Sequence, residues 1–342
     1  MITSIPLETI EQQLLRQLSS FFFLSEEDIG LIKFKMKRVI SRCEYCFSHT
    51  VNKYYSYNGE TFFNPYQSAQ YTIFLYYFAN TISYETGNQL LADKLYYLNK
   101  IMNACDLYHE VELPDFFTLD HPVGSVMGRA RYGEGFSFSQ NCTVGNNRGI
   151  YPTLGQNVQM CANSSIIGDC NIGDNVIIGA NSGVKDENVP DNCIVFGYSP
   201  NLTIKQKKMK NIAIIPARGG SKRIPRKNIK PFMGKPIIAY SIEAALQSEL
   251  FDEVMVSTDD DEIANIAQQY GAKVPFMRSA DTANDYATTS DVINEVISYY
   301  HERNQAFDII SCIYATAPFI TKDILKKAYQ EMQESRYDSI FQ

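Results

Sequence analysis

Several features of other protein classes are missing from this 342-residue sequence. No apolar run approaches the length of a membrane span, so we expect no membrane-spanning segment. The first residues lack the basic, apolar and small-residue order of a secretory leader, and we therefore expect a cytoplasmic protein. Acidic residues outnumber Lys and Arg by 38 to 31, and the net charge of −7 argues against nucleic acid as a partner.

Cysteine and histidine offer little for a metal or redox centre. The eight cysteines are scattered, and in a long chain without a leader we expect them to be reduced. Cys43 and Cys46 have the spacing of a metal or redox pair, but no second pair or histidine cluster follows them. Buried thiols on a helix are the favoured interpretation. There are only four histidines: His49, His109, His121 and His301.

What the sequence does contain is three segments of different character. Residues 1–115 carry apolar residues at three- and four-residue spacing, which predicts helices over 8–23, 26–51, 68–82 and 88–108. Tyrosine is abundant in this segment, and we expect it to pack the helices together. Residues 205–210 (KQKKMK) are predicted to be a short basic linker to the third segment, residues 211–342.

The second segment, residues 116–204, repeats with a period of six. Apolar residues recur at every sixth position with a four-residue slip at 150–153, and smaller side chains follow four places later. The apolar series is Val126, Tyr132, Phe138, Val144, Leu154, Met160, Ile166, Ile172, Ile178 and Val184, and the smaller series is Val158, Ser164, Cys170, Val176 and Ser182. This periodicity predicts a parallel β-helix with one short strand per hexad and an apolar column inside.

These hexads, with the preceding helices and the His-Pro pair at 121–122, resemble the serine acetyltransferase group of acyltransferases over about residues 70–204. The resemblance implies a left-handed β-helix, usually trimeric, that binds acetyl-CoA between coils. That family's histidine base is missing from the hexads, where Gln140 occupies the expected region and cannot perform the proton transfer. Two alternatives remain: an acetyltransferase that uses His121, or His109 across a trimer interface, and a trimerisation scaffold without activity.

The densest group of functional signals is the loop at residues 216–228 (PARGGSKRIPRKN), which follows a short β-branched strand. Its cations are Arg218, Lys222, Arg223, Arg226 and Lys227. The consecutive glycines Gly219 and Gly220 allow a sharp turn, and their amides can point together at an anion. Such a loop suits a polyphosphate, because hydrogen bonds between charged groups are the strongest. It does not match the Walker pattern.

Strands and helices alternate through residues 211–342. We predict strands at 211–216, 253–258, 273–277 and 308–314, and helices at 236–248, 260–270, 287–301 and 321–334. Alternation of this kind predicts a Rossmann-like parallel sheet wrapped by helices, with ligands at the carboxyl ends of the strands. That places residues 218–228, 257–259 and 315–318 along one edge of the sheet.

The loop and four later motifs resemble the CMP-sugar synthetases, which activate nonulosonic acids such as sialic acid with CTP. These motifs are FDEVMVSTDD at 251–260, VPFMR at 274–278, residues 281–289, and YATAPF at 314–319. YATAPF is more similar to the pseudaminic acid branch than to the sialic acid branch. The resemblance implies a cytidylyltransferase that makes CMP-sugar and pyrophosphate with Mg²⁺, fused to the β-helix and acting in surface glycan biosynthesis.

Matching the family's motifs onto this chain gives a set of candidate site residues. Phosphate contact and catalysis are implied for Arg218, Lys222 and Lys227, and nucleotide binding for Ala217, Gly219, Gly220, Ser221, Asn228, Arg278 and Thr288. Ion pairing with Asp281 or Asp285 is the alternative for Arg278. Thr288 has a second interpretation as a helix cap. The acidic run 259–261 resembles a metal cluster but is explained by helix capping, and Arg223 and Arg226 suit either a ligand or the solvated surface.

The family's Mg²⁺ ligands are a pair of aspartates near its carboxyl end, and no such pair is found before Gln342. We therefore expect the metal ligands to lie beyond Gln342 and the cytidylyltransferase domain to be incomplete in this chain. The expectation is that the chain binds nucleotide without turnover.

Overall fold

A computed structural model describes residues 1–221, 224–303 and 305–335. The chain divides into two compact units, Met1–Lys207 and Lys208–Gln342, called the N-terminal and C-terminal units below. The N-terminal unit holds the helical segment and the coils on one continuous apolar core. This differs from the predicted separation at residues 115 and 116, because strand β4 (Asp106–Leu107) already belongs to the coils through its pairing with β6 (Val126–Met127).

Four helices open the N-terminal unit, close to the predicted positions. They are α1 (Leu7–Phe21), α2 (Glu26–Ser48), α3 (Ser68–Thr86) and α4 (Gln89–Asn103), with a 3₁₀ turn at Lys53–Tyr55 and a small sheet of β1 (Ile2–Thr3), β2 (Ser56–Tyr57) and β3 (Glu60–Phe63). Helix α3 is buried over most of its length. Its Tyr76 and Tyr77 hydroxyls donate to the carbonyls of Val111 and Asp115 at 2.7 and 2.9 Å, so tyrosines fix the helices to the segment entering the coils.

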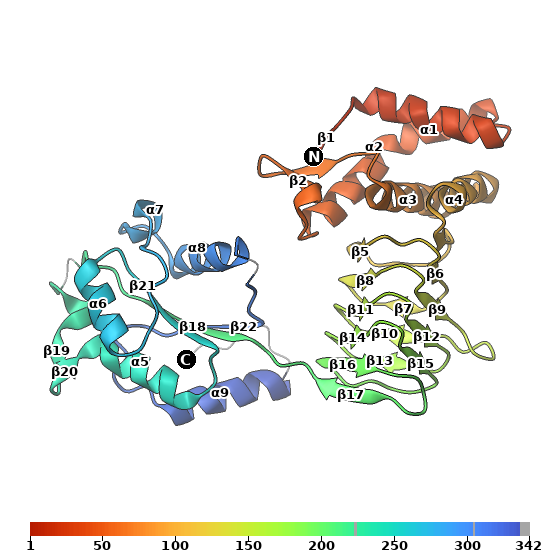
Figure 1. Ribbon diagram of the computed structural model, residues 1–342. Coiled ribbons are helices and arrows are strands. Elements are labelled where there is room, and N and C mark those ends of the chain that lie inside the picture. Colours follow the sequence, from red (N-terminus) through yellow and green to blue (C-terminus); the bar gives the residue numbers. More distant parts are fainter. Residues whose placement is uncertain (222–223, 304, 336–342) are drawn as a thin grey trace. The chain divides into compact units, whose positions relative to one another are not determined.

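Three parallel sheets form the coils, which are stacked below α3 and α4 in Figure 1. One sheet contains β4, β6, β9 (Thr143–Gly145), β12 (Ser165–Ile167) and β15 (Gly183–Lys185); the second contains β5 (Phe117–Leu119), β8 (Phe136–Phe138), β11 (Gln159–Met160), β14 (Ile177–Ile178) and β16 (Cys193–Phe196); the third contains β7 (Arg131–Tyr132), β10 (Thr153–Leu154) and β13 (Asn171–Ile172). Met160 lies in register with Phe138 and Ile178, which confirms the predicted stacking of hexads.

The inner column follows the predicted hexads except at its start. Every residue of the apolar series from Tyr132 to Val184 is buried, as are the smaller residues four places later. Val126 is 41% exposed and Met127 is buried instead, so the prediction is one residue out of register there. Asparagines turn the corners with positive φ, and Asn163 joins Asn141 and Asn181 through side-chain hydrogen bonds of 2.9 and 3.1 Å.

Two further boundaries differ from the sequence prediction. Residues 205 and 206 are not linker but belong to β17 (Thr203–Gln206), which pairs antiparallel with β16. At the start of the four-residue slip, Asn147 and Ile150 form an isolated antiparallel bridge that closes a turn. Cys43 and Cys46 are buried and free, as expected of core thiols.

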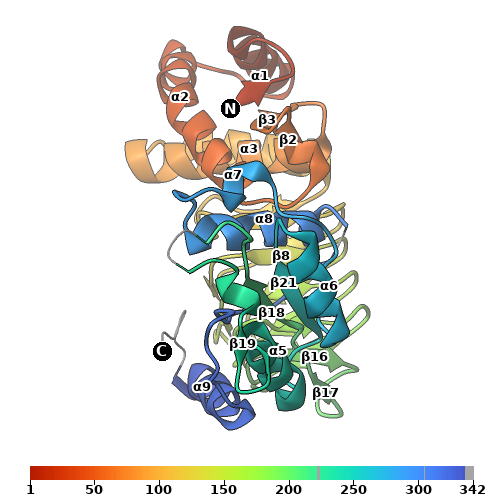
Figure 2. The ribbon, with the colours of Figure 1, turned by 90° about the vertical axis from the view of Figure 1, so that its left-hand side faces the viewer.

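The C-terminal unit is a three-layer α/β arrangement. Its parallel sheet has the order β21 (Glu253–Ser257), β18 (Asn211–Pro216), β22 (Ile309–Cys312), so the chain reverses its direction of crossover at the central strand β18. Helices α5 (Ile237–Ser248), α6 (Asp261–Gln269) and α9 (Lys322–Ser335) cover one face, and α8 (Thr289–His301) covers the other. Figure 2 shows α5 beside α9.

Strand β18 is buried on both faces, as a central strand of such a sheet must be. Ala213 and Ile215 pack toward α5, while Ile212 and Ile214 pack toward α8. The unit is completed by the 3₁₀ turn Lys227–Ile229, a hairpin of β19 (Pro231–Phe232) and β20 (Lys235–Pro236), and α7 (Ala280–Ala283). The predicted strand at 273–277 is wrong: only Lys273 forms a bridge, with Met255, and Pro275 lacks the N–H that a ladder needs.

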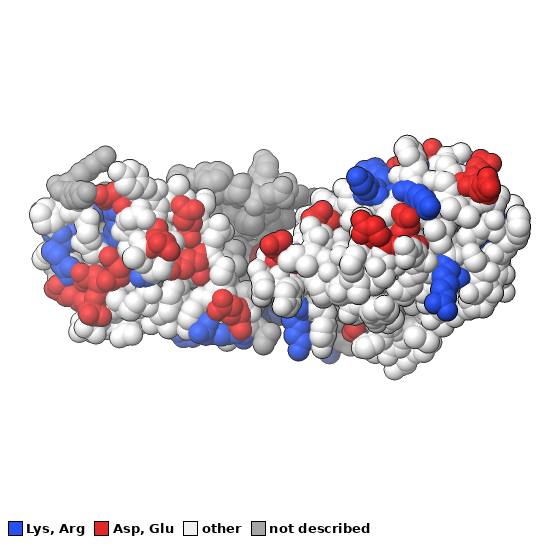
Figure 3. Space-filling view, turned by 90° about the horizontal axis from the view of Figure 1, so that it is seen from above, with Lys and Arg blue, Asp and Glu red and all other residues white. Residues whose placement is uncertain are grey.

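Two features of the surface and helices bear on partners. None of the helices in the described ranges combines the length and apolar character needed to span a bilayer. On the face of the molecule shown in Figure 3, Lys and Arg lie among Asp and Glu.

Candidate functional site

The candidate site lies where the loop 217–228 leaves the carboxyl end of β18. The Gly219 amide donates to the Asp259 carboxylate at 2.8 Å. A Cβ at Gly219 would lie 2.6 Å from Asp260 Oδ2, whereas a Cβ at Gly220 would meet no atom of the described residues within 4 Å. The structure therefore differs from the predicted nest of two glycine amides, because a carboxylate of the protein accepts the Gly219 N–H.

The first part of the loop, residues 217–221, is called the entry arm below, and backbone hydrogen bonds hold the residues beside Gly219. Ala217 is buried, and its amide donates to the Ser257 carbonyl of β21 at 2.9 Å. The Ser221 amide donates to the Gly219 carbonyl at 3.0 Å, which tightens the turn. Lys222 and Arg223, two of the predicted loop cations, lie outside the described residues.

Arg218 is joined to the turn between α7 and α8. Its guanidinium donates to the Asn284 carbonyl and forms an ion pair with Asp285, both at 2.8 Å. The side chain is 32% exposed, so it lies at the surface of the site. The sequence analysis considered an ion pair of Asp285 with Arg278, but in the structure Asp285 pairs with Arg218.

The exit arm of the loop is anchored by Arg226 and Asn228, on either side of Lys227. Asn228 is buried, and its side-chain amide donates to the Arg218 carbonyl at 2.9 Å, so it joins the two arms. This contact with the chain itself is one that the resemblance did not imply for Asn228. Lys227 is half-buried and begins the 3₁₀ turn that follows.

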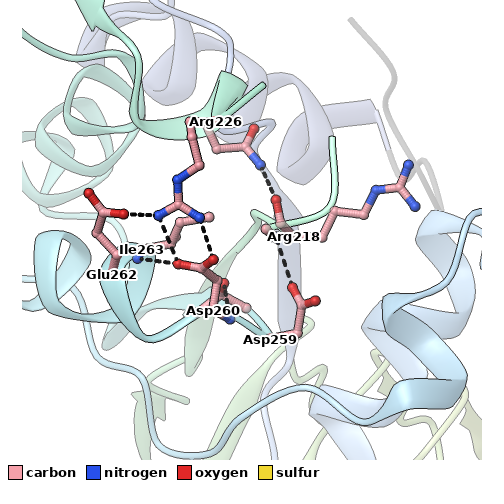
Figure 4. A network of polar contacts seen from close by, with 9 residues as sticks. Arg218, Arg226, Asp259, Asp260, Glu262 and Ile263 are labelled. Carbon is pink, nitrogen blue, oxygen red and sulfur yellow. Dashed lines mark hydrogen bonds and ion pairs between the residues drawn. The ribbon is translucent and has the colours of Figure 1, made fainter. Parts of the chain in front are cut away.

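Arg226 was left undecided by the sequence and is the centre of an ion-pair network. Its guanidinium contacts both oxygens of Asp260 and also Glu262, as Figure 4 shows. The Asp260 carboxylate also accepts the Ile263 amide at 3.0 Å and so caps α6. The guanidinium of Arg226 lowers the pKa of Asp260, because it stabilises the ionised carboxylate.

Arg278 is 7% exposed, and its guanidinium is directed at Ser257. Nε donates to the Ser257 hydroxyl at 3.0 Å and a terminal N–H donates to the Ser257 carbonyl. Burial lowers the pKa of Arg278, opposed by the negative charges of Asp259 and Glu295, and an arginine remains protonated at neutral pH. The structure thus places a desolvated positive charge at the end of β21.

Thr288 caps helix α8, in line with one of its two sequence interpretations. Its hydroxyl accepts the Asp291 amide at 3.2 Å, and the Asp291 carboxylate accepts the Thr288 amide at 2.7 Å. This backbone hydrogen bond lowers the pKa of Asp291. Thr289 Oγ1 lies 3.2 Å from the hydroxyl of Tyr314, the first residue of the YATAPF motif.

The acidic run at 259–261 does not form a metal cluster. Asp259 accepts an amide and Asp260 is engaged by Arg226, as described above. In the described ranges no group of three or more His, Cys, Asp or Glu side chains could hold a metal ion. These residues therefore do not fit a resident Mg²⁺.

The acyltransferase candidates of the N-terminal unit are dispersed. The His121 side chain is 86% exposed, adopts φ +49°, and lines a small cavity with Ser68, Thr72 and Asn103. Gln140 is exposed on the coils. His109 is fully buried, its Nε2 lies 3.0 Å from Asp93 Oδ1, and its Nδ1 has no hydrogen-bond partner among the described residues.

Comparison with known proteins separates the same two parts of the chain. Residues 212–342 match the cytidylyltransferase family model, and residues 151–186 match the bacterial transferase hexapeptide model. A serine acetyltransferase structure from Neisseria gonorrhoeae aligns with 53% of this chain and 72% of its own at 22% identity, with a TM-score of 0.44.

Two curated relatives match the C-terminal unit. The pseudaminic acid cytidylyltransferase of Campylobacter jejuni is 53% identical over 133 residues, which are 39% of this chain and 57% of the relative. The CMP-N,N'-diacetyllegionaminic acid synthase of Legionella pneumophila is 45% identical over 125 residues, 36% of this chain and 53% of the relative. The chain spans about half the length of these relatives, and over that span residues 212–342 are similar to cytidylyltransferases of the CMP-sugar synthetase type.

Proposed function

We propose that the C-terminal unit binds CTP and is the nucleotide-binding part of a CMP-sugar synthetase. The observation that carries the proposal is the position of the loop 217–228 at the carboxyl end of β18, where the crossover direction reverses and α/β sheets bind ligands. Arg218 and Lys227 bring positive charge to this edge, and Arg278 adds a buried one. The 53% identity to a pseudaminic acid cytidylyltransferase supports the assignment.

The reaction we propose is attack of a nonulosonic acid hydroxyl on the α-phosphate of CTP. The sugar oxygen forms a bond to phosphorus, the bond to the β-phosphate oxygen breaks, pyrophosphate leaves, and the hydroxyl proton passes to solvent. Arg218 and Lys227 offset the charge on the phosphates, which is the main contribution a protein makes to such a transfer. Arg218 would exchange Asp285 for phosphate, since both are anionic partners of a guanidinium. A sugar of the pseudaminic acid type is proposed from YATAPF and the relatives.

The test is calorimetric titration of the 342-residue chain with CTP, and with UTP and CMP for comparison. We expect CTP to bind best. Lys227→Met should weaken CTP binding roughly ten- to a hundredfold, because a hydrogen bond to a charged group is lost. Arg303→Ala is the control, because Arg303 is an exposed cation of the same unit whose side chain, among the described residues, contacts Tyr299 and Glu302 at the end of its own helix. If CTP gave no heat and protected no part of residues 211–230 from hydrogen exchange, the proposal would fail.

A second candidate function for the N-terminal unit is transfer of an acetyl group from acetyl-CoA to a sugar. The observation in its favour is the exposed His121 at a cavity, since acyl transfer needs a base within reach of the acceptor hydroxyl. Release of CoA thiol with candidate sugars, lost in His121→Ala, would support it; absence of acetyl-CoA binding would remove it. Without that activity we propose a left-handed trimerisation scaffold, which a monomeric mass for the full chain would rule out.

A further inference from the structure

Arg226 differs from the other described loop cations because two carboxylates already face it. Its guanidinium contacts both oxygens of Asp260 and one oxygen of Glu262. A fork engaged by a carboxylate through two N–H groups has satisfied its preferred geometry. One positive and two negative charges leave this group of three with a net negative charge, which does not attract a phosphate. The charge of Arg226 is therefore already neutralised by carboxylates of the protein.

Asp260 connects Arg226 to the opposite arm of the loop. The Asp260 carboxylate lies so close to Gly219 that a Cβ there would approach Asp260 Oδ2 to 2.6 Å. The adjacent Asp259 accepts the Gly219 amide at 2.8 Å. Helix α6 fixes Asp260 in turn, because the same carboxylate caps it at Ile263. The start of α6 thus holds the entry arm at Gly219 and the exit arm at Arg226.

The backbone at Arg226 explains why the exit arm needs such an anchor. Arg226 adopts φ +55°, a left-handed conformation that costs a residue with a side chain about 1 kcal/mol or more. The 3₁₀ turn begins directly after it, with the Ile229 amide donating to the Arg226 carbonyl at 3.1 Å. The direction of the Lys227 and Asn228 side chains therefore depends on holding Arg226 in this conformation.

We propose that Arg226 is a positioning residue: bound to Asp260 and Glu262, it presets the loop so that Lys227 meets the nucleotide without reorganisation while Asn228 holds the Arg218 carbonyl. The contacts of Arg226 with Asp260 and Glu262, called the brace below, rest on the structure alone. Their effect on nucleotide binding rests on the proposed CTP site. A site that is only fractionally preset has its apparent dissociation constant raised by the inverse of that fraction. Loss of the brace should therefore appear as weaker binding of nucleotide by a loop that is otherwise intact.

The first experiment needs no ligand and measures hydrogen exchange in the free protein. In Arg226→Ala, amides of residues 227–230 should exchange about two- to fivefold faster than in the parent chain, in line with the loss of a well-formed ion pair. Arg303→Ala is the control and should leave this segment unchanged. Unaltered exchange at 227–230 in Arg226→Ala would overturn the brace, whether or not the protein binds CTP.

The second experiment is a double-mutant cycle on CTP affinity with Arg226→Ala and Asp260→Asn. Asparagine is a good N-cap and keeps the acceptor for the Ile263 amide while removing the charge, so α6 should remain intact. A brace predicts that each variant weakens CTP about three- to tenfold and that the double variant is no weaker than either single one. If Arg226 instead binds phosphate, Asp260→Asn frees it and CTP binds more tightly.

Tighter CTP binding in Asp260→Asn, or fully additive losses of affinity in the double variant, would overturn the proposal. Arg226→Lys should not restore the affinity, because an ammonium cannot engage both oxygens of Asp260 in the planar fork geometry. Full recovery with lysine would also count against the brace. If the parent chain binds no CTP, the proposed function fails while the exchange experiment still decides the brace.

Discussion

The close approach of the loop to α6 makes a sharp prediction for its two glycines. In Gly219→Ala the new Cβ would lie 2.6 Å from Asp260 Oδ2 and 2.8 Å from Asp260 Cβ. The Asp260 Cβ cannot move away as the end of a side chain can, because it is bonded to the backbone at the start of α6. The carboxylate cannot turn freely either, because Arg226 and the Ile263 amide hold it. We expect a cost of about 1–3 kcal/mol, typical of an extra methyl in a packed site.

Gly220→Ala is the matched control one residue away. A Cβ there meets nothing within 4 Å in the part of the chain that the structure describes, and Gly220 is not among the described residues with positive φ. Alanine at such a position reduces the entropy of the unfolded chain and stabilises by about 0.4–1 kcal/mol. The two variants should therefore move stability in opposite directions.

The measurement that separates them is hydrogen exchange of peptides from β18 and β21, which reports the opening free energy of the C-terminal unit alone. This choice matters because the chain has two units, and a single melting curve is not a two-state quantity. Equal exchange in Gly219→Ala and Gly220→Ala would refute the packing argument. Faster exchange in Gly220→Ala would refute it more strongly.

Three further predictions follow from individual contacts. Ile166→Ala in the inner column should destabilise the N-terminal unit by about 2–5 kcal/mol, seen as faster exchange in the coils, because a fully buried side chain leaves a cavity. Arg226 lowers the pKa of Asp260, so the stability that this carboxylate contributes is present above the ordinary aspartate pKa of about 3.9 and is lost as pH falls below it. In Asp260→Asn, the opening free energy of α6 measured by hydrogen exchange should therefore change less as pH falls below about 4. An unchanged pH dependence would count against the ion pair of Arg226 and Asp260. Thr288→Ala should cost about 1 kcal/mol in α8, whereas Thr288→Ser should cost little, since serine keeps the hydroxyl that caps Asp291.

The sequence predicted most of the architecture because its signals are local and periodic. Six-residue spacing predicted the buried column from Tyr132 to Val184, and it was out of register only at Val126, where the next inner residue follows Met127 after five places. Alternating strands and helices predicted the sheet around β18. The strand at 273–277 was wrong, because a short apolar run does not reveal that its ladder stops after Lys273.

The partners of the charged side chains could not be predicted in the same way. Which carboxylate meets which guanidinium depends on how the ends of β18 and β21 and the turn before α8 come together. Asp285 pairs with Arg218, and Asp260 pairs with Arg226, yet the spacing in sequence favours neither pairing. A signal for the second pair was present, since Arg226 follows a glycine turn and Asp260 opens a helix. That signal could be interpreted only after the structure had shown that Arg226 and Asp260 lie at the same edge of the sheet.

The two consecutive aspartates also show why the number of cations in a loop is not the number available to a ligand. Asp259 and Asp260 lie directly beneath the entry arm, where bare carboxylates would repel a polyphosphate. One accepts the Gly219 amide and the other takes the charge of Arg226, so both are compensated within the protein. Among the described loop cations this leaves Lys227, and Arg218 once it exchanges Asp285 for phosphate, as the ones we propose to contact the ligand. Mutation of either should therefore lower the salt dependence of CTP binding, measured as affinity against ionic strength, and an unchanged salt dependence would count against their contact with the phosphates.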